Sequence, residues 1–153
     1  MVYKMKQTLQ IITALLFITS TAFPQSKANV NSLKEYGGKT FKVDDDKPYT
    51  GRVFDVYEST GGIKLEGYYR NGIKNGKWTW WTENGQKEVE RTYKNGESDG
   101  LQIWWHKNGQ KSSERTYKDG ELISEKDWNK DGSVKEGSIF RTDDIIPDLS
   151  NDF

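Results

Sequence analysis

Short runs rich in aromatic and β-branched residues follow one another along residues 49–137, and Asn-Gly or Asp-Gly closes most of them. Such runs, bounded by turn-forming residues, are typical of β-strands. Nothing within residues 39–137 shows the apolar spacing of 3.6 residues that a helix requires. The pattern therefore predicts an all-β fold.

The pattern returns every 24 residues, because Trp80-Trp81 becomes Trp104-Trp105 and the run 90–93 becomes the run 114–117. A fixed period of this size is the signature of stacked supersecondary units. The predicted repeats are residues 49–72, with a one-residue shift near Gly51, residues 73–96, residues 97–120 and a degenerate unit at 121–137. Together they form one predicted repeat domain, residues 49–137.

The turns indicate that each repeat is one β-hairpin. Asn84-Gly85 lies between two β-prone runs and predicts a two-residue type I′ turn, since both residues tolerate positive φ. Asn95-Gly96 marks the reverse turn to the next hairpin. We therefore expect an elongated antiparallel meander of stacked β-hairpins, with about eight strands.

A two-residue turn at Asn84-Gly85 fixes the pairing within the hairpin, and successive side chains then alternate between the two faces of the sheet. The expected partners are Trp81 with Glu88, Trp80 with Val89, Thr79 with Glu90, Trp78 with Arg91, and Gly76 with Tyr93. The first face is predicted to carry Trp78, Trp80, Val89, Tyr93, Phe54, Val56, Leu65, Tyr69, Trp104 and Tyr117. Gly76 and Gly100 lie opposite Tyr93 and Tyr117, where a ring has room to lie on bare backbone.

The second face carries the candidate binding residues. Tyr57, Trp81 and Trp105 form a row there, rimmed by carboxylates that include Glu90 and Glu114. Aligned rings stack on sugars or cationic groups, and they also serve as anchors in protein interfaces. The competing interpretation is that both aromatic faces are structural.

The two ends of the chain differ from the repeats. Residues 1–22, with Lys4, Lys6 and an apolar run at 9–18, are typical of a secretory signal peptide, and an amphipathic anchor is the alternative. Residues 23–48 are predicted to be a linker with one short strand at 39–43, and residues 138–153 an acidic tail. The chain contains no cysteine, so it offers no lipid-anchor Cys after the signal. We expect a secreted or periplasmic protein without a transmembrane segment in the mature chain.

Charge and composition narrow the partners. The 23 basic and 23 acidic residues balance, and loss of Lys4 and Lys6 with the signal peptide leaves 21 against 23. A chain so balanced has no field to attract nucleic acid, so we expect no nucleic-acid partner. Six Trp residues supply much of the apolar area, which favours a thin aromatic sheet over a large aliphatic core.

Candidate chemistry is sparse. His106 is the only histidine and lies at a variable hairpin end, which is a poor place for a catalytic base. Asp127, Asn129 and Asp131 resemble the first half of a calcium-binding loop, although the bidentate Glu of such loops is missing. Asp131-Gly132 also falls on a repeat turn, so turn chemistry is the alternative. We predict no enzyme activity and no cofactor, and calcium binding stays open.

The units Gly76-Lys-Trp-Thr-Trp-Trp-Thr-Glu-Asn-Gly-Gln-Lys87 and Tyr93-Lys-Asn-Gly96 resemble the bacterial variant of the MORN repeat, and the resemblance covers about residues 49–137. It implies an elongated antiparallel sheet of hairpins and no catalytic motif. Members of this family are often labelled antitoxins, which implies a protein partner. The leading hypothesis is thus an exported scaffold or antitoxin-type module that binds a protein. The alternative is binding of a cell-envelope glycan through the aromatic face.

Overall fold

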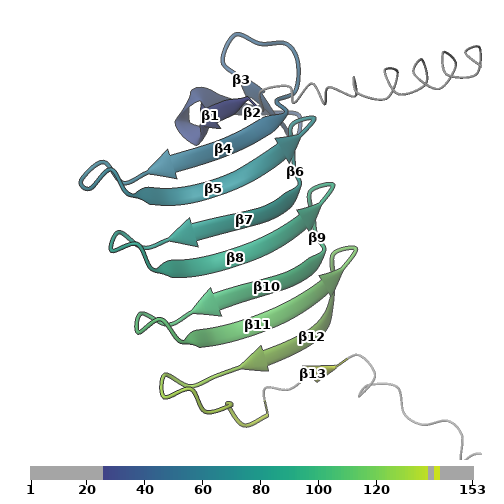
Figure 1. Ribbon diagram of the computed structural model, residues 1–153. Helices are drawn as coiled ribbons and strands as arrows, with labels where there is room; N and C mark the ends of the chain where they lie inside the picture. Colours follow the sequence, from purple (N-terminus) through teal and green to yellow (C-terminus); the bar gives the residue numbers. More distant parts are fainter. Residues whose placement is uncertain (1–25, 138–139, 142–153) are drawn as a thin grey trace, which may run out of the picture.

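The computed structural model describes residues 26–137 and 140–141, and most of them form one sheet that is a single layer thick (Figure 1). The long strands are β4 (Gly51–Val56), β5 (Ile63–Arg70), β7 (Gly76–Trp81), β8 (Lys87–Lys94), β10 (Gly100–Trp105), β11 (Lys111–Lys118) and β12 (Glu121–Asp127). Each pairs antiparallel with the next, so the predicted meander of stacked hairpins is confirmed. The predicted signal peptide (1–22) lies outside the described residues, as does the acidic tail (138–153) apart from 140–141.

Short strands complete the sheet. They are β1 (Lys27–Asn29), β6 (Ile73–Lys74), β9 (Glu97–Ser98) and β13 (Phe140–Arg141). β1 pairs with β4 in parallel, so the sheet is mixed and not antiparallel throughout. β6 and β9 are the return segments at the far ends of β5 and β8.

The turn types differ from the prediction. The type I′ turns are at Asn71-Gly72, Asn95-Gly96 and Asp119-Gly120, where both residues have positive φ. Asn84 does not have positive φ; instead, Thr82 N–H donates to Gln86 O and Gly85 N–H donates to Thr82 O. This is a three-residue loop ending in a left-handed Gly85, so the type I′ assignment at Asn84-Gly85 is wrong.

The longer loop shifts the pairing next to it. Trp81 pairs with Lys87, and Glu88 becomes the extra residue of a β-bulge between Trp80 and Trp81. The predicted pairing of Trp81 with Glu88 is therefore wrong. The pairs farther from the loop are confirmed: Trp80 with Val89, Thr79 with Glu90, Trp78 with Arg91, and Gly76 with Tyr93.

The first hairpin has a loop one residue longer than the others. Tyr57 N–H donates to Gly62 O across four residues, whereas Thr82 N–H reaches Gln86 O across three. The one-residue shift between repeats thus lies in this loop and not near Gly51. Tyr57 consequently occupies the position of Thr82, and Val56 the position of Trp81.

This shift also changes the faces of β4. Gly51 pairs with Tyr69 and Val53 with Gly67, so Val53 and Asp55 lie on the face of Trp78. Phe54 pairs with Glu66 and lies on the opposite face. The prediction that Phe54 and Val56 share the Trp78 face is wrong.

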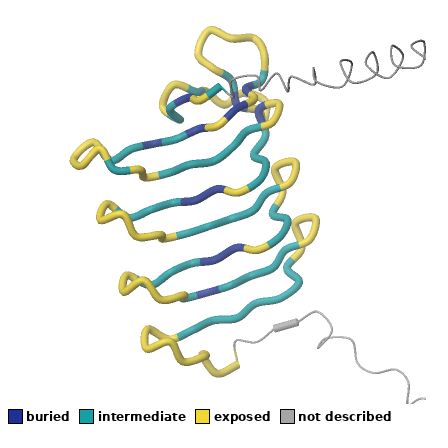
Figure 2. The backbone as a smooth tube through the Cα atoms, in the orientation of Figure 1, coloured by how far each residue is buried: buried dark blue, intermediate teal, exposed yellow. Residues whose placement is uncertain are grey.

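The core is small and lies at the N-terminal end of the sheet. It comprises the buried side chains Ala28, Tyr49, Val53 and Trp78, and the last two are 1% and 2% exposed. Figure 2 shows that the rest of the sheet is mainly half-buried, as expected for a layer without a second sheet. Apolar stabilisation is therefore concentrated in the first two hairpins.

Trp78 packs on bare backbone. A Cβ atom at Gly67, in the neighbouring strand, would lie 2.3 Å from Cδ2 of the Trp78 ring. The ring also lies edge-on to Tyr69 and Tyr93, at centroid distances of 5.0 and 6.4 Å. At Gly76, by contrast, a Cβ would meet nothing within 4 Å, so the ring of Tyr93 does not lie on that glycine as the sequence predicts.

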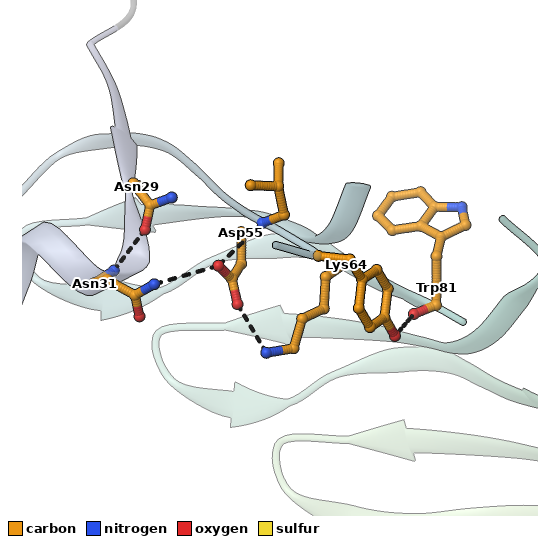
Figure 3. A network of polar contacts seen from close by, with 7 residues as sticks. Asn29, Asn31, Asp55, Lys64 and Trp81 are labelled. Atoms are coloured by element: carbon orange, nitrogen blue, oxygen red, sulfur yellow. Dashed lines mark hydrogen bonds and ion pairs between the residues drawn. The ribbon is translucent and has the colours of Figure 1, made fainter. Parts of the chain in front are cut away.

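Residues 27–42, expected to be a linker with one strand, are structured and cap the sheet. After β1 come the 3-10 helix η1 (Val30–Ser32) and a two-stranded sheet of β2 (Leu33–Tyr36) and β3 (Lys39–Lys42). Val30 and Leu33 pack against the core. Figure 3 shows the polar link, in which Asn31 Nδ2 donates to Asp55 Oδ1 at 3.4 Å and Asp55 binds Lys64 at 3.0 Å.

Candidate binding face

Tryptophans at equivalent positions of successive hairpins form a row, here called the tryptophan row: Trp81, Trp105 and Trp128. Trp81 and Trp105 each end the first strand of their hairpin, next to the bulge. Trp128 occupies the same position in the last hairpin. Its backbone N–H donates to Ser112 O, and the last three-residue loop follows shortly after it. Two of the predicted candidates therefore lie in the row, and Trp128 is a third that sequence reasoning missed.

A lysine lies over the ring in two members of the row and also binds a glutamate of the same face. Lys87 Nζ lies 5.6 Å from the Trp105 ring centroid and 2.9 Å from Glu90 Oε2. Lys111 Nζ lies 5.8 Å from the Trp128 ring centroid, and it forms an ion pair of 2.6 Å with Glu114. Each ring is thereby tied to a Lys–Glu pair by a cation–π contact. The predicted rim residues Glu90 and Glu114 do lie beside the row.

Glu90 receives two lysines. Lys77 Nζ lies 2.8 Å from Oε1, while Lys87 occupies the other carboxylate oxygen. Partial burial acts to raise the pKa of Glu90, but the hydrogen bonds from Lys77 and Lys87 outweigh it and hold the pKa below 4.5. The carboxylate is therefore ionised at neutral pH and fixed in position.

The rings of the row are half-buried, as is Tyr57. The lysines cover part of the Trp105 and Trp128 rings. Leu101, which shares a face with Trp105 in the alternation of β10, is 43% exposed and adds apolar surface to that face. The face presents aromatic edges between fixed charges.

Tyr57 and His106 belong to a different set of positions, the first residue before each hairpin loop. The Tyr57 hydroxyl donates to Trp81 O at 2.7 Å, and His106 Nε2 lies 2.9 Å from Trp128 O (Figure 3 shows the first contact). A carbonyl oxygen only accepts, so Nε2 of His106 carries a hydrogen. Both side chains link one hairpin to the next, which gives His106 a structural role.

The calcium-like segment forms the last hairpin loop. Gly132 N–H donates to Asn129 O, and Asn129 Nδ2 donates to Ser133 Oγ at 3.0 Å. Asp131 Oδ1 accepts from the hydroxyl and the amide of Ser133, and these bonds lower the pKa of Asp131. The turn thus uses a carboxylate oxygen of Asp131. Within the described residues, no group of three or more His, Cys, Asp or Glu side chains is arranged to hold a metal ion.

The face of Trp78 carries Trp80 and Trp104 as predicted, and arginines stack on these rings, which the sequence pattern does not predict. Arg91 Cζ lies 5.8 Å from the Trp80 ring centroid and 5.4 Å from that of Trp104, and Arg115 Cζ lies 5.1 Å from the Trp104 centroid. Arg115 Nε donates to Glu125 Oε1 at 2.8 Å. The sequence does contain a signal for this stacking in the repeated Glu-Arg-Thr-Tyr segment. Adjacent residues of a strand point to opposite faces, so each Arg lies on the Trp78 face when the Glu before it lies on the other face.

The fold and its repeated aromatic hairpins define a β-repeat protein with aromatic side chains on both faces of its sheet. Residues 74–95 and 98–119 match the family model described as MORN repeat variant, so two adjacent repeats of this chain are similar to that repeat. No curated protein and no solved structure matches the chain. Across the residues described, the structure has no helix of the length and apolarity needed to span a membrane.

Proposed function

We propose that the protein is an exported, non-catalytic scaffold that binds another protein through the tryptophan row, in the manner of an antitoxin- or immunity-type inhibitor. The observation that carries the proposal is the recurrence of one Trp per hairpin at Trp81, Trp105 and Trp128. Each lies on the same face, about 10 Å from the next, since each hairpin advances the sheet by two strand spacings.

The surroundings of the row match the composition of protein interfaces. Trp anchors surrounded by charged residues are characteristic of interface hot spots. The Lys87–Glu90 and Lys111–Glu114 pairs are held in place, so they supply fixed charges of both signs at low entropic cost. Such a pattern selects a partner with a complementary order of charges.

The alternative is binding of a cell-envelope glycan. Rings in a row favour stacking on sugars, but ammonium groups lie over the rings of Trp105 and Trp128. A sugar would have to displace them. This contact favours a protein partner over a neutral glycan.

The experiment is quantitative capture from the native envelope fraction with the purified protein as bait. Wild type should retain a defined protein that Trp81→Ala and Trp105→Ala each lose by about tenfold, as interface anchors do. Lys130→Ala, in an exposed loop, is the matched control and should retain it. The proposal would be contradicted if the Trp variants captured the same proteins as wild type while the wild-type protein was retained on purified peptidoglycan or polysaccharide. That result would support the glycan alternative.

Export is proposed from the predicted signal peptide alone. The N-terminus of the protein recovered from the envelope should begin near residue 23. Recovery with residues 1–22 still attached would indicate an anchored protein instead.

A further inference from the structure

Two cations on the Trp78 face lie over aromatic rings. Lys74 Nζ lies 4.7 Å from the Trp78 ring centroid and 5.3 Å from that of Tyr93, and Arg91 lies between Trp80 and Trp104. Among the described residues no carboxylate pairs with either of them. Arg115, one strand pair away, makes the contrast, because it binds Glu125.

The two unmatched charges are close together. Lys74 Nζ lies 6.0 Å, and Arg91 Cζ 5.8 Å, from the same Trp80 ring centroid. They are therefore at most about 12 Å apart, which is the sum of these two distances. An extended chain advances about 3.3 Å per residue and points every second side chain to the same side. Two acidic side chains that flank an apolar one span such a distance.

Unpartnered donors lie around Arg91. Within the described part of the chain, Arg91 Nε, Gln102 Nε2 and Ser113 Oγ are buried and have no hydrogen-bond partner. Gln102 is only 3% exposed and pairs with Arg115, while Ser113 pairs with Trp104. The register of β8 and β10 sets Gln102 opposite Arg91. Arg91 thus finds no acceptor for its Nε within the described part of the chain, and the two neutral groups beside it supply no counter-charge.

We propose that this patch binds an extended acidic segment of a partner protein, with carboxylates on Arg91 and Lys74 and an apolar side chain on Trp80. A guanidinium stacked on rings keeps its N–H edge available for a bidentate carboxylate. Charge complementarity identifies the occupant, since Arg91 and Lys74 face no negative charge of their own. The site lies on the opposite face from the tryptophan row, so it goes beyond the proposed function.

The test is fluorescence anisotropy with a labelled eight-residue peptide that contains Glu-Ser-Leu-Ser-Glu, so that both Glu side chains and the Leu between them lie on the same side of an extended chain; it is titrated with the purified protein. The same peptide with Gln in place of Glu is the ligand control. Wild type should bind the Glu peptide at least about tenfold more tightly than the Gln peptide, because charged bonds are lost. Arg91→Gln should weaken binding about tenfold and Lys74→Gln about threefold.

Lys87→Gln is the matched control variant, because it removes a ring-bound lysine from the opposite face. It should change the affinity less than about twofold, and so should Trp81→Ala. If Arg91→Gln does not fold, as its thermal midpoint will show, the Lys74→Gln result decides alone. Equal affinity for both peptides, or an unchanged affinity in the folded Arg91 and Lys74 variants, would overturn the proposal. Tighter, Arg91-dependent binding of a glucuronate oligomer would overturn it as well, in favour of an acidic glycan.

Discussion

The close contact between Gly67 and the Trp78 ring shows how much a single position can decide. In the next two repeats the equivalent positions hold Arg91 and Arg115, whose side chains stack on rings instead. The bare backbone at Gly67 lets the largest core ring lie flat on the sheet. The first hairpin thus has a core where the later ones have a cation–π ladder.

Gly67→Ala should destabilise the protein by about 2–3 kcal/mol, because the new Cβ would overlap the Trp78 ring in a region that cannot relax freely. Urea unfolding measures the change. Gly62→Ala is the control, since its Cβ would meet only Thr60 Oγ1 at 3.3 Å, and it should cost less than about 1 kcal/mol. Equal losses in the two variants would refute this packing.

Glu90→Gln should cost about 1 kcal/mol at pH 7, because the paired carboxylate loses its charge-assisted bonds to Lys77 and Lys87. The folded pKa lies below 4.5, so this stabilisation is present above pH 4.5 and is lost as the pH falls through the folded pKa. The difference between wild type and variant in unfolding free energy should therefore shrink as the pH falls below 4.5 and disappear once the pH is well below the folded pKa. A difference that is constant with pH would show that the ion pairs do not stabilise the fold.

At this scale the sequence predicts most of the binding face and misses part of it. Trp81 and Trp105 are placed correctly because their repeats have equal length. Trp128 is missed because it follows Trp105 by 23 residues instead of 24, and Tyr57 is misplaced because the first loop holds an extra residue. Insertions within loops leave the repeat pattern visible but shift the residues that it aligns.

Among the elements, the turns are the least predictable from sequence. Asn-Gly or Asp-Gly stands at both ends of the hairpins, and only the hydrogen bonds show which pair adopts the type I′ turn. Asn95-Gly96 does so, while Asn84-Gly85 closes a three-residue loop. Local composition is nearly the same at the two sites, so the choice depends on how the flanking strands pair.

Asn95→Val should destabilise the protein by about 1–2 kcal/mol, because a β-branched residue is strained at the φ of 52° that Asn95 adopts. Asn95→Gly tolerates the same φ and should lie within about 0.5 kcal/mol of wild type. Thermal or urea unfolding of the two variants gives the comparison. If Val and Gly are equivalent at this position, Asn95 does not require the left-handed conformation.

For the whole molecule, the sequence predicts a single elongated sheet correctly because the hairpin pattern is local and repeated. It does not predict the cap of residues 27–42, since these residues have no clear period and their order depends on contacts with the first hairpin. Ala28 pairs beside Val53 and closes the N-terminal edge that would otherwise stay open. At the other end of the sheet, β13 is the one strand of the described residues that pairs with the outer edge of β12.

The concentration of the core at one end predicts unequal effects of the tryptophans on stability. Trp78→Ala should cost about 3–5 kcal/mol, because the ring is nearly fully buried. Trp80→Ala and Trp104→Ala should each lower the free energy of unfolding by less, about 2 kcal/mol, because these rings are half-buried. Urea unfolding ranks them, and an equal cost for all three would mean that the core extends along the sheet.

The central claim is that the tryptophan row binds a partner while Trp78 holds the fold. The direct measurement is partner capture and thermal midpoint for Trp105→Ala and Trp78→Ala side by side. We expect Trp105→Ala to capture about tenfold less partner than wild type, with a thermal midpoint within a few degrees of wild type. Trp78→Ala should lower the thermal midpoint by more than about 10 °C. A Trp105→Ala variant that unfolds, or that remains folded and keeps its partner, would contradict the account.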